Sequence, residues 1–362
     1  MTGIKPYFCA PAFAHSAGPR TAQIALVGEA FGEQEALVGK PFIGNSGQEL
    51  SRLLNEAGIK RSECFLTNTI AARPASGRVA SNNFDLFCGP KAAVGSAYSY
   101  PPISSGKYLL PQYLPELDRL KVELEEVRPN LVIALGAKAL WALCRTATIS
   151  SLRGTVMHST LVPGLKVLPT YHPSYLFKVW SHRPIVLADL MKARREAQFP
   201  EIRRPSRSVI VNPTIDEISE WVHDTLAAPP SLLSTDVETS HGQITMVGFA
   251  RSRSDAIVVP FCDGRTGVNY WNSTLTEVRA RQLCNLLLGS RIPKLTQNGL
   301  YDIQYFLREK FTLRNFTEDT MLLHHSMFPE MKKGLGFLGS IYTSEPAWKL
   351  MRKHQEELKR DE

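Results

Sequence analysis

The chain has 362 residues, of which 43% are hydrophobic and 21% are charged, and its formal net charge is +8. This composition is typical of a globular protein, and no run reaches the roughly 18 apolar residues of a membrane-spanning helix, which excludes a membrane protein. The length predicts two domains, and the positive charge favours an anionic partner such as nucleic acid.

The six cysteines contain no CxxC pair, which argues against a disulfide framework and against a four-cysteine metal site. They are Cys9, Cys64, Cys88, Cys144, Cys262 and Cys284. The N-terminal stretch lacks the long apolar core of a signal peptide. We therefore expect a soluble protein of a reducing, cytosolic compartment.

The first half of the chain predicts strands that alternate with helices. Short apolar runs are typical of buried strands, and between them lie segments with apolar residues at helical spacing. The stretch 88–111 is rich in Gly, Ser, Pro and Tyr and predicts a long surface loop. We expect an α/β domain over residues 1–200, with a doubly wound, mainly parallel sheet and a site at the carboxyl ends of its strands. The expected strands are 22–30, 63–70, 131–136 and 165–171, and the expected helices are 47–59, 114–127, 137–143 and 183–199.

Polar and aromatic residues stand at the ends of three of these strands, where a core needs none. Glu29 follows the first strand, Asn68 ends the second and His172 follows the fourth, while Phe42 lies in a Pro-Phe-Ile-Gly turn. An amide, an aromatic face, a carboxylate and an imidazole are what a pocket for a flipped base requires. Taken singly, each residue has a structural alternative. Glu29 can be a charge at the start of a helix, and Phe42 can be a ring of the core. Asn68 can form a turn, and His172 can be a loop histidine.

Four segments of this half, in order, resemble the successive motifs of the uracil-DNA glycosylase superfamily, in particular its family four branch. They are GEAFGEQEALVGKPFIGNSGQEL, LTNTIAARP, LVIALGAKAL and PTYHPSYLF, and the resemblance covers roughly residues 24–197. It implies that Glu29 orients the attacking water and that Phe42 stacks on uracil. It also implies that Asn68 hydrogen-bonds the uracil edge and that His172 stabilises the departing uracil anion. The implied reaction is hydrolysis of the N-glycosidic bond, which leaves an abasic site.

The sequence departs from the family four pattern in three respects. Phe31 stands where the family usually has proline, and it is expected to narrow the mouth of the pocket. Ala36 stands where the family has an acidic residue. Cys9 and Cys88 lie near two of the four positions that hold an iron–sulfur cluster in the family, but their partners are missing, so no iron–sulfur cluster is expected.

A basic, proline-containing stretch at residues 201–208 predicts a linker, and a second domain is expected over residues 209–362. This half begins with a strand and a helix and continues through three strands over 231–239, 243–250 and 255–261, with further helices behind them. The pattern predicts a mixed sheet with helices.

Two carboxylates in the first of these three strands, Asp236 and Glu238, lie two residues apart and therefore on one face. Asn298 and Asp302 follow at a spacing of four, which predicts one face of a helix. Oxygen ligands of this kind suit Mg²⁺ or Mn²⁺, and two such ions support phosphodiester hydrolysis. The structural alternative is a strand with solvated charges and an unrelated helical aspartate.

The segments STDVETS and QNGLYDIQYF resemble two motifs of the DEDD 3′–5′ exonucleases, specifically the proofreading domain of family A DNA polymerases. The resemblance implies a ribonuclease H-like fold, with Asp236, Glu238 and Asp302 as ligands of two Mg²⁺ or Mn²⁺ ions. Glu238 would also orient the attacking water, and Asn298 would contact the DNA strand, which the resemblance implies is a single-stranded 3′ end. The family's third motif is missing, which leaves Asp361 as a weak candidate for a fourth ligand.

We therefore predict a DNA-processing hydrolase with two domains, a uracil-DNA glycosylase-like domain followed by a metal-dependent exonuclease domain. The arrangement resembles the front part of phage-type DNA polymerases, which implies a separately encoded polymerase chain as a partner and the cytoplasm of a bacterial or phage-infected cell as the location. The alternative is a non-catalytic, DNA-binding accessory subunit of such a polymerase.

Overall fold

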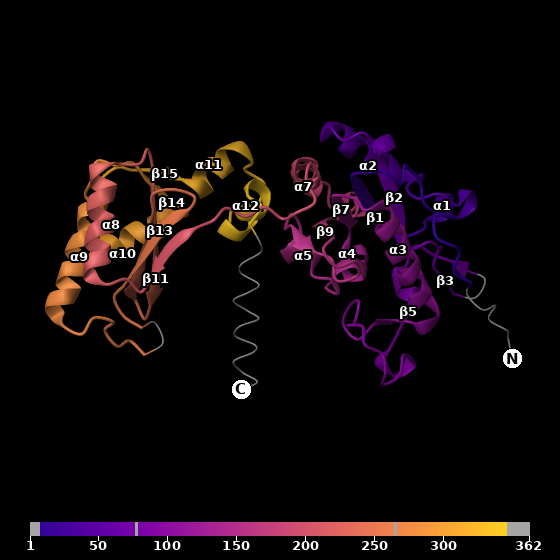
Figure 1. Cartoon of the computed structure of the whole chain (residues 1–362), viewed down its shortest axis with the longest axis horizontal. Helices are drawn as coiled ribbons and strands as arrows, with labels where there is room; N and C mark the ends of the chain where they lie inside the picture. The colour runs from indigo at the N-terminus through magenta and orange to yellow at the C-terminus, as the bar shows by residue number, and fades with distance from the viewer. Residues whose placement is uncertain (1–7, 77–78, 264–265, 346–362) are drawn as a thin grey trace. The chain divides into compact units, whose positions relative to one another are not determined.

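The computed structural model describes residues 8–76, 79–263 and 266–345, which form two compact units (Figure 1). Within these residues, the first unit consists of 8–203 and 336–345, and the second consists of the described part of 204–335. This division differs from the predicted one at the C-terminal end, because residues 336–345 pack with the first unit.

The first unit contains strands and helices in alternation, as its sequence predicts. Its elements in chain order are β1 (Ile24–Ala30), α1 (Glu33–Val38), α2 (Asn45–Glu56), η1 (Arg61–Glu63), β2 (Cys64–Ile70), β3 (Ala75–Ser76), β4 (Val79–Ala80), η2 (Phe84–Phe87), β5 (Cys88–Gly89), η3 (Lys91–Ala93), β6 (Tyr108–Leu109), η4 (Pro111–Tyr113), α3 (Leu114–Val127), β7 (Leu131–Leu135), α4 (Ala137–Cys144), α5 (Ile149–Leu152), β8 (Met157–His158), β9 (Lys166–Thr170), α6 (Pro173–Leu176), η5 (Trp180–His182), α7 (Arg183–Glu196) and, after the second unit, α12 (Leu335–Tyr342).

The main sheet of the first unit has the strand order β2-β1-β7-β9-β8. The first four strands run parallel, and only the short β8 runs antiparallel to its neighbour. Every residue of β2, β7 and β9 is buried, as expected for parallel strands covered on both faces. The predicted doubly wound, mainly parallel sheet is confirmed.

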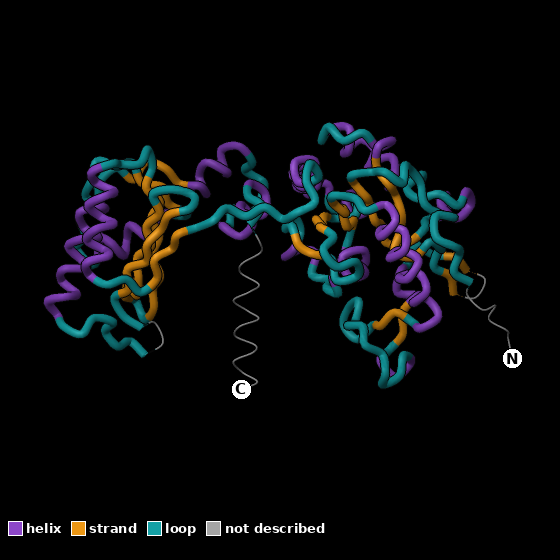
Figure 2. The backbone as a smooth tube through the Cα atoms, in the orientation of Figure 1, coloured by secondary structure: helices purple, strands orange, loops and turns teal. Residues whose placement is uncertain are grey.

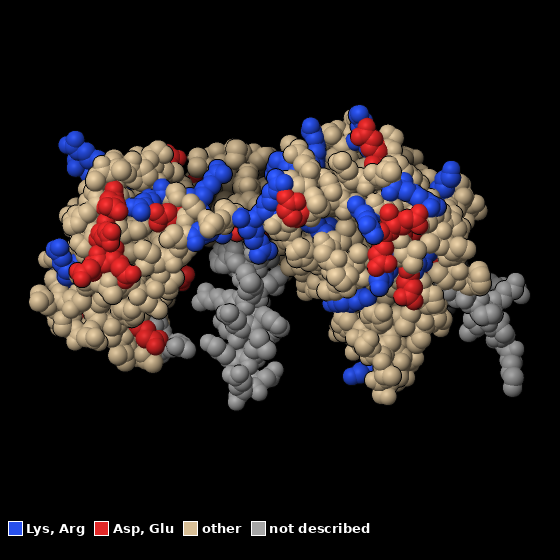
Figure 3. All heavy atoms as spheres, viewed as in Figure 1, with Lys and Arg blue, Asp and Glu red and all other residues tan. Residues whose placement is uncertain are grey.

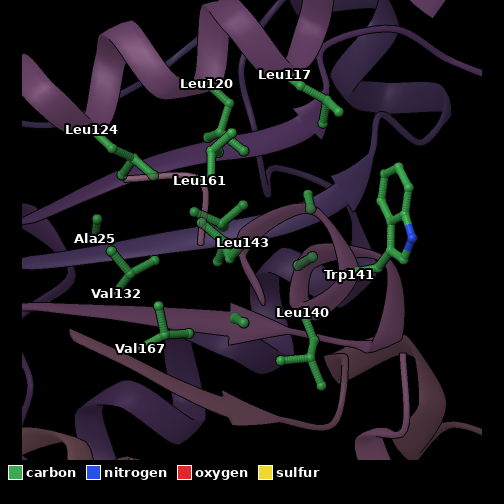
Figure 4. Close-up of a cluster of buried hydrophobic side chains, with 14 of the residues drawn as sticks. Ala25, Leu117, Leu120, Leu124, Val132, Leu140, Trp141, Leu143, Leu161 and Val167 are labelled. Atoms are coloured by element: carbon green, nitrogen blue, oxygen red, sulfur yellow. The ribbon is translucent and has the colours of Figure 1, made fainter. Parts of the chain in front are cut away.

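Helices cover both faces of this sheet and supply two separate hydrophobic clusters. Leucines of α3 pack with α4 on one face (Figure 4), and leucines of α2 pack with α7 on the other. Figure 2 shows these helices beside the strands. The two layers bury the strands and leave the strand ends as the open edges of the sheet.

The stretch 88–111 is less open than the predicted surface loop. Its two ends pair as β5 and β6, Ile103 is buried, and the indole nitrogen of Trp141 donates a hydrogen bond to the carbonyl of Pro101. The Tyr98 ring lies close to the rings of Tyr100 and Tyr108. These rings pack within the stretch, and Trp141 holds it against the first unit through Pro101 and through the Tyr100 ring, which lies 6.2 Å from its own.

The second unit has one sheet and helices on its faces. Its elements are β10 (Ser208–Val211), α8 (Ile215–Ala227), β11 (Leu233–Ser240), β12 (Gln243–Ala250), β13 (Asp255–Pro260), α9 (Thr274–Leu288), β14 (Lys294–Thr296), α10 (Gly299–Arg308), β15 (Phe316–Asp319) and α11 (Thr320–Met327).

The sheet of the second unit is mixed, with the strand order β10-β13-β12-β11-β14-β15. Strands β11, β12 and β13 form an antiparallel meander, and β14 and β15 add to β11 in parallel. This is the mixed sheet that the sequence predicts for the second domain. Along β11, Leu233, Thr235 and Val237 are buried. Asp236 and Glu238 are exposed, so buried and exposed side chains alternate along the strand.

Two further observations concern the whole of the described chain. All six cysteines are free in the structure. Within residues 8–76, 79–263 and 266–345, each helix is too short or too polar to cross a membrane.

Candidate active site

The parallel sheet of the first unit brings the four predicted site residues to one edge. Parallel strands end at the same side of a sheet, so residues at their carboxyl ends meet although they are far apart in the chain. Gly28 of β1 pairs with Asn68 of β2, and Glu29 follows Gly28 directly. His172 comes two residues after the end of β9. Both Glu29 and His172 lie close to Gly136, which follows β7.

Gly28 is the point at which Asn68 and Phe42 meet. A β-carbon at Gly28 would lie 2.2 Å from Oδ1 of Asn68 and 2.5 Å from Cζ of Phe42, so a residue with a side chain does not fit there. Asn68 is 2% exposed and Phe42 is 5% exposed. The amide and the ring therefore meet over Gly28, near the end of β1.

Gly136 is likewise the point at which Glu29 and His172 meet. A β-carbon at Gly136 would lie 2.4 Å from Oε1 of Glu29 and 3.0 Å from Cβ of His172, and its φ of 93° also favours glycine. Oε1 of Glu29 accepts a hydrogen bond of 3.3 Å from the backbone N–H of Lys138, in the first turn of α4. The ring of His172 lies 6.2 Å from that of Phe42 and is inclined to it by 29°. The carboxylate, the imidazole and the aromatic ring thus share one site.

The hydrogen bonds of His172 define its tautomer. Its Nδ1 accepts a hydrogen bond of 3.2 Å from the backbone N–H of Ser174 and lies 2.7 Å from the Ser174 hydroxyl. Because a backbone N–H only donates, Nδ1 carries the lone pair, and the proton of the neutral ring is on Nε2. Burial lowers the pKa of His172, although the charges of Glu29 and Glu35 oppose the shift. The neutral ring therefore offers Nε2–H as a hydrogen-bond donor.

Glu35 supports this site and was not singled out from the sequence. It is buried on α1, and its Oε1 accepts hydrogen bonds of 3.0 Å and 2.8 Å from the backbone N–H groups of Ile43 and Gly44. These bonds hold the loop that carries Phe42, whose own φ of 57° lies in the left-handed region. A glutamate that follows Glu33 and Gln34 on a short helix carries no signal of burial, so only the structure identifies it.

Two of the three departures from the family four pattern lie at α1, where Phe31 precedes the helix and Ala36 lies on it. Phe31 is buried, and its ring packs edge-on against His15 at 5.8 Å. Its backbone N–H donates a hydrogen bond to the carbonyl of Ala72. Ala36 is exposed on α1.

A buried ionic cluster on α3 supports the strand that carries Asn68. Arg119 donates to Glu116 and Glu123 at 2.8 Å each, and its Nη2 donates a hydrogen bond of 2.6 Å to the carbonyl of Asn68. The side chains of all three charged residues are at most 2% exposed. Glu123 also accepts a hydrogen bond from the Thr67 hydroxyl. The sequence shows only an amphipathic helix here.

The second unit carries the predicted carboxylates on β11 and α10. Strand β14 pairs with β11 only at Leu233 and Ser234, so β11 has an open edge beyond that point. There the Oδ1 of Asp302, which is 3% exposed, accepts a hydrogen bond of 2.9 Å from the backbone N–H of Val237. Asp302 thus lies beside the strand segment that holds Asp236 and Glu238.

Asn298 does not share a helical face with Asp302, contrary to the prediction from their spacing. It precedes α10 and has a φ of 60°, so it is outside the helix. The carboxylate of Asp319 accepts hydrogen bonds from the backbone N–H groups of Asn298 and Gly299, and also from those of Met321 and Leu322. These four bonds lower the pKa of Asp319 against the effect of its burial, and they join the starts of α10 and α11.

Asp236, Glu238 and Asp302 do not form a metal-binding group among the described residues, and Asp361 lies outside them. Within the described ranges, no three or more His, Cys, Asp or Glu side chains are close enough together to hold a metal ion. Negative charge nevertheless accumulates at α10. Burial raises the pKa of Asp302 to about 6, the charges of Asp236 and Asp319 add to the shift, and the hydrogen bond from Val237 opposes it. Burial and Glu238 likewise raise the pKa of Asp236.

Replacement of Asp302 by asparagine is expected to stabilise the second unit at about pH 8. The folded chain keeps the Asp302 proton up to about pH 6, whereas the unfolded carboxyl loses it near its model value of 3.8, so stability is lost as the pH rises through this range. The gain is at most about 3 kcal/mol, since one pKa unit is worth about 1.4 kcal/mol. Scanning calorimetry of Asp302→Asn at about pH 4 and pH 8 measures it. Asp224→Asn, at an exposed position on α8, is the control. An equal change in the free energy of unfolding in both variants would contradict the expectation.

The surface charge does not form a uniform basic face. Figure 3 shows basic and acidic side chains interspersed on the visible side of each unit. In the predicted basic linker, Arg203 pairs with Glu201 at 2.5 Å and its guanidinium lies 3.9 Å from the ring centroid of Phe199. The excess of positive charge is therefore partly neutralised where the sequence is most basic.

The first unit is similar to known proteins over most of its length. The family model described as "Uracil DNA glycosylase superfamily" matches residues 15–198. A type-4 uracil-DNA glycosylase of Thermotoga maritima is 32% identical over 176 residues, which cover 48% of this chain and 76% of that protein. One of Saccharolobus solfataricus is 32% identical over 165 residues, which cover 43% of this chain and 63% of that protein.

Among solved structures, Escherichia coli RNase D matches 39% of this chain and 34% of its own, with a TM-score of 0.27 and 16% identity. The EXD2 exonuclease domain soaked in Mn and GMP matches 38% of this chain and 71% of its own, with a TM-score of 0.26 and 16% identity.

Proposed function

Because the chain belongs to the uracil DNA glycosylase superfamily, we propose that its first unit removes uracil from DNA by hydrolysis of the N-glycosidic bond. One observation carries this proposal. Glu29, Asn68 and His172 follow or end three different strands and gather with Phe42 at one edge of the sheet, around Gly28 and Gly136. The type-4 uracil-DNA glycosylases named above are the relatives that this unit is similar to.

Each of the four side chains supplies one part of the reaction. The amide of Asn68 hydrogen-bonds the edge of the flipped uracil, and the ring of Phe42 stacks on its face. Glu29 orients a water molecule toward the sugar carbon. As the water oxygen bonds to this carbon and passes a proton to the Glu29 carboxylate, the electron pair of the broken glycosidic bond passes to uracil, and the Nε2–H of His172 donates a hydrogen bond to the oxygen that becomes negative. The neutral imidazole fits this role, since its Nε2–H donates while Nδ1 accepts the hydrogen bond from Ser174.

The test is excision from a single-stranded oligonucleotide with one uracil, followed by alkaline cleavage, in EDTA. We expect His172→Ala to lower the single-turnover rate by at least about 100-fold, the lower end of what such groups contribute. His158→Ala, at an exposed histidine on β8, is the matched control and should keep the full rate. The rate should fall on the acid side only below pH 6.5, because burial lowers the pKa of His172 from that value. Equal rates in the two variants would refute the assignment.

A second candidate function for the second unit is metal-dependent 3′–5′ exonuclease activity of the polymerase-proofreading type. The observation that favours it is the group of carboxyl side chains at α10, where burial together with Asp236 and Asp319 raises the pKa of Asp302 to about 6. The described residues do not form a complete ligand group, so we assign no catalytic step to a metal. Shortening of a labelled 3′ end that requires Mg²⁺ or Mn²⁺ and is lost in Asp236→Ala would support this candidate.

If neither uracil excision nor shortening occurs while DNA is still bound, the chain acts as a non-catalytic accessory subunit. The same assays decide this, because DNA affinity is measured alongside both rates. A separately encoded DNA polymerase is the partner to test by co-sedimentation with the full chain.

A further inference from the structure

Two buried lysines of the first unit bind the two segments that connect it to the second unit. One segment precedes residue 204, and the other follows residue 335. Lys166 is fully buried, and its Nζ donates to the carbonyls of Glu196, Phe199 and Glu201 at 2.6, 2.7 and 3.0 Å. Lys192 is 1% exposed, and its Nζ donates to the carbonyls of Gly154, Ser340 and Thr343. Two of the three acceptors of Lys192 therefore belong to residues 336–345, which we call the return segment.

The return segment makes further specific contacts with the same place. Nη1 of Arg153 donates a hydrogen bond of 3.0 Å to the Ser340 hydroxyl, and its guanidinium lies 5.4 Å from the ring centroid of Phe337. The hydroxyl of Ser344 donates a hydrogen bond of 2.7 Å to Glu196. A buried ammonium or guanidinium is stable only with its hydrogen-bond partners in place, so the first unit is built to receive this segment.

The place where it docks is joined to the uracil site by consecutive hydrogen bonds. Arg153 donates to both carboxylate oxygens of Asp189, at 3.0 Å and 2.6 Å. Oδ2 of Asp189 also accepts a hydrogen bond of 2.7 Å from the Thr170 hydroxyl, and Thr170 ends β9 two residues before His172. We call Arg153, Asp189 and Lys192 the socket.

Thr170 connects the socket to a second part of the site. Its carbonyl accepts a hydrogen bond of 2.9 Å from the backbone N–H of Gly136, the residue that lies against both Glu29 and His172. The fit around the socket is tight, because a β-carbon at Gly154 would lie 2.7 Å from Oδ1 of Asp189 and 2.7 Å from the carbonyl of Ser340. A close-packed group of this kind transmits displacement rather than absorbing it.

We propose that the return segment is a positioning element of the uracil site, which acts through Arg153, Asp189 and Thr170 on the strand end that holds His172. This inference rests on the proposed excision activity of that site. It means that the glycosylase site is complete only after the chain has passed through the second unit and docked again. The segment touches no reacting atom, so its effect is on the placement of His172.

The test compares Lys192→Met with Lys166→Met in the full chain. Both lysines are buried and donate to three backbone carbonyls, but only Lys192 donates to the return segment itself. Lys166 reaches that segment only through Glu196, whose carboxylate lies 3.5 Å from its Nζ and accepts from Ser344. We expect Lys192→Met to lower the single-turnover excision rate about tenfold, a moderate part of the roughly 100-fold cost of misplacing a group by about 1 Å, with unchanged affinity for DNA. It should also shift the ring signals of His172 in NMR spectra. Lys166→Met should lower the thermal midpoint similarly but change the rate less than about twofold.

A milder pair of variants covers the case in which Lys192→Met does not fold. Ser340→Ala removes the hydroxyl that Arg153 contacts and should shift the His172 signals, whereas Ser340→Thr should restore them. Unshifted His172 signals in Ser340→Ala, or equal rates in the two lysine variants, would overturn the proposal. If the unaltered chain excises no uracil, the proposed function fails, but the NMR comparison still decides whether the segment positions His172.

Discussion

Replacement of Gly28 by alanine is expected to lower uracil excision by at least about 100-fold while the first unit stays folded. The new β-carbon would lie 2.2 Å from Oδ1 of Asn68 and 2.5 Å from Cζ of Phe42, so the amide, the ring or both must move. A misplacement of about 1 Å in a catalytic group costs about 100-fold in rate. Because the two residues contact the uracil in the proposed complex, the loss should appear in both uracil affinity and rate.

Single-turnover excision and equilibrium binding of uracil-containing DNA measure this effect. Gly248→Ala is the matched control, since Gly248 lies in β12 and a β-carbon there would have the carbonyl oxygen of Asp236 as its nearest neighbour, at 3.9 Å. The control should keep its full excision rate. A Gly28→Ala chain that excises uracil at the unaltered rate would show that Asn68 and Phe42 do not form the wall of the uracil pocket.

Replacement of Arg119 by methionine is expected to cost about 3–5 kcal/mol of stability, the usual result of removing one partner from a buried ionic group. Glu116 and Glu123, both fully buried, would lose their counter-charge, and the carbonyl of Asn68 would lose a hydrogen bond of 2.6 Å. Burial by itself lowers the pKa of Arg119, but the charges of Glu123 and Glu116 outweigh it and raise the value. The guanidinium is therefore held in its charged form.

Denaturation by urea, followed by circular dichroism, measures this loss. Lys121→Met on the same helix is the control, because its pair with Glu125 is exposed and 3.8 Å long, and exposed pairs are worth about 0–1 kcal/mol. A triple variant that also carries Glu116→Gln and Glu123→Gln should recover much of the loss, since no unpaired charge then remains buried. Equal stability of Arg119→Met and Lys121→Met would contradict the role of the cluster.

Several features of the fold are already present in local patterns of the sequence. The apolar runs at 131–136 and 165–171 indicate strands buried on both faces, and the structure places β7 and β9 there. Because parallel strands end at one edge, the positions of Glu29 and Asn68 near the ends of their strands, and of His172 after its strand, were enough to predict that they meet. The mixed sheet of the second unit follows from closely spaced short strands in the same way.

Other features depend on contacts between residues that are distant in the chain. Asn298 and Asp302 have helical spacing, yet Asp319 binds the N–H of Asn298 and holds that residue outside α10. The predicted end of the second domain differs from the structure for a similar reason, because Lys192 binds the carbonyls of Ser340 and Thr343, about 150 residues further along the chain. Neither contact has a local pattern that would reveal it.

The sequence by itself therefore determined which side chains stand at the strand ends and which chemistry they offer, since strand periodicity and the direction of parallel strands are local properties. The tertiary structure decided how those side chains are held. Gly28 and Gly136 leave room for them, Glu35 and Arg119 fix the backbone around Phe42 and Asn68, and the return segment docks beneath the strand of His172. The physical reason is that burial and hydrogen-bond partners across tens of residues exist only once the chain is folded.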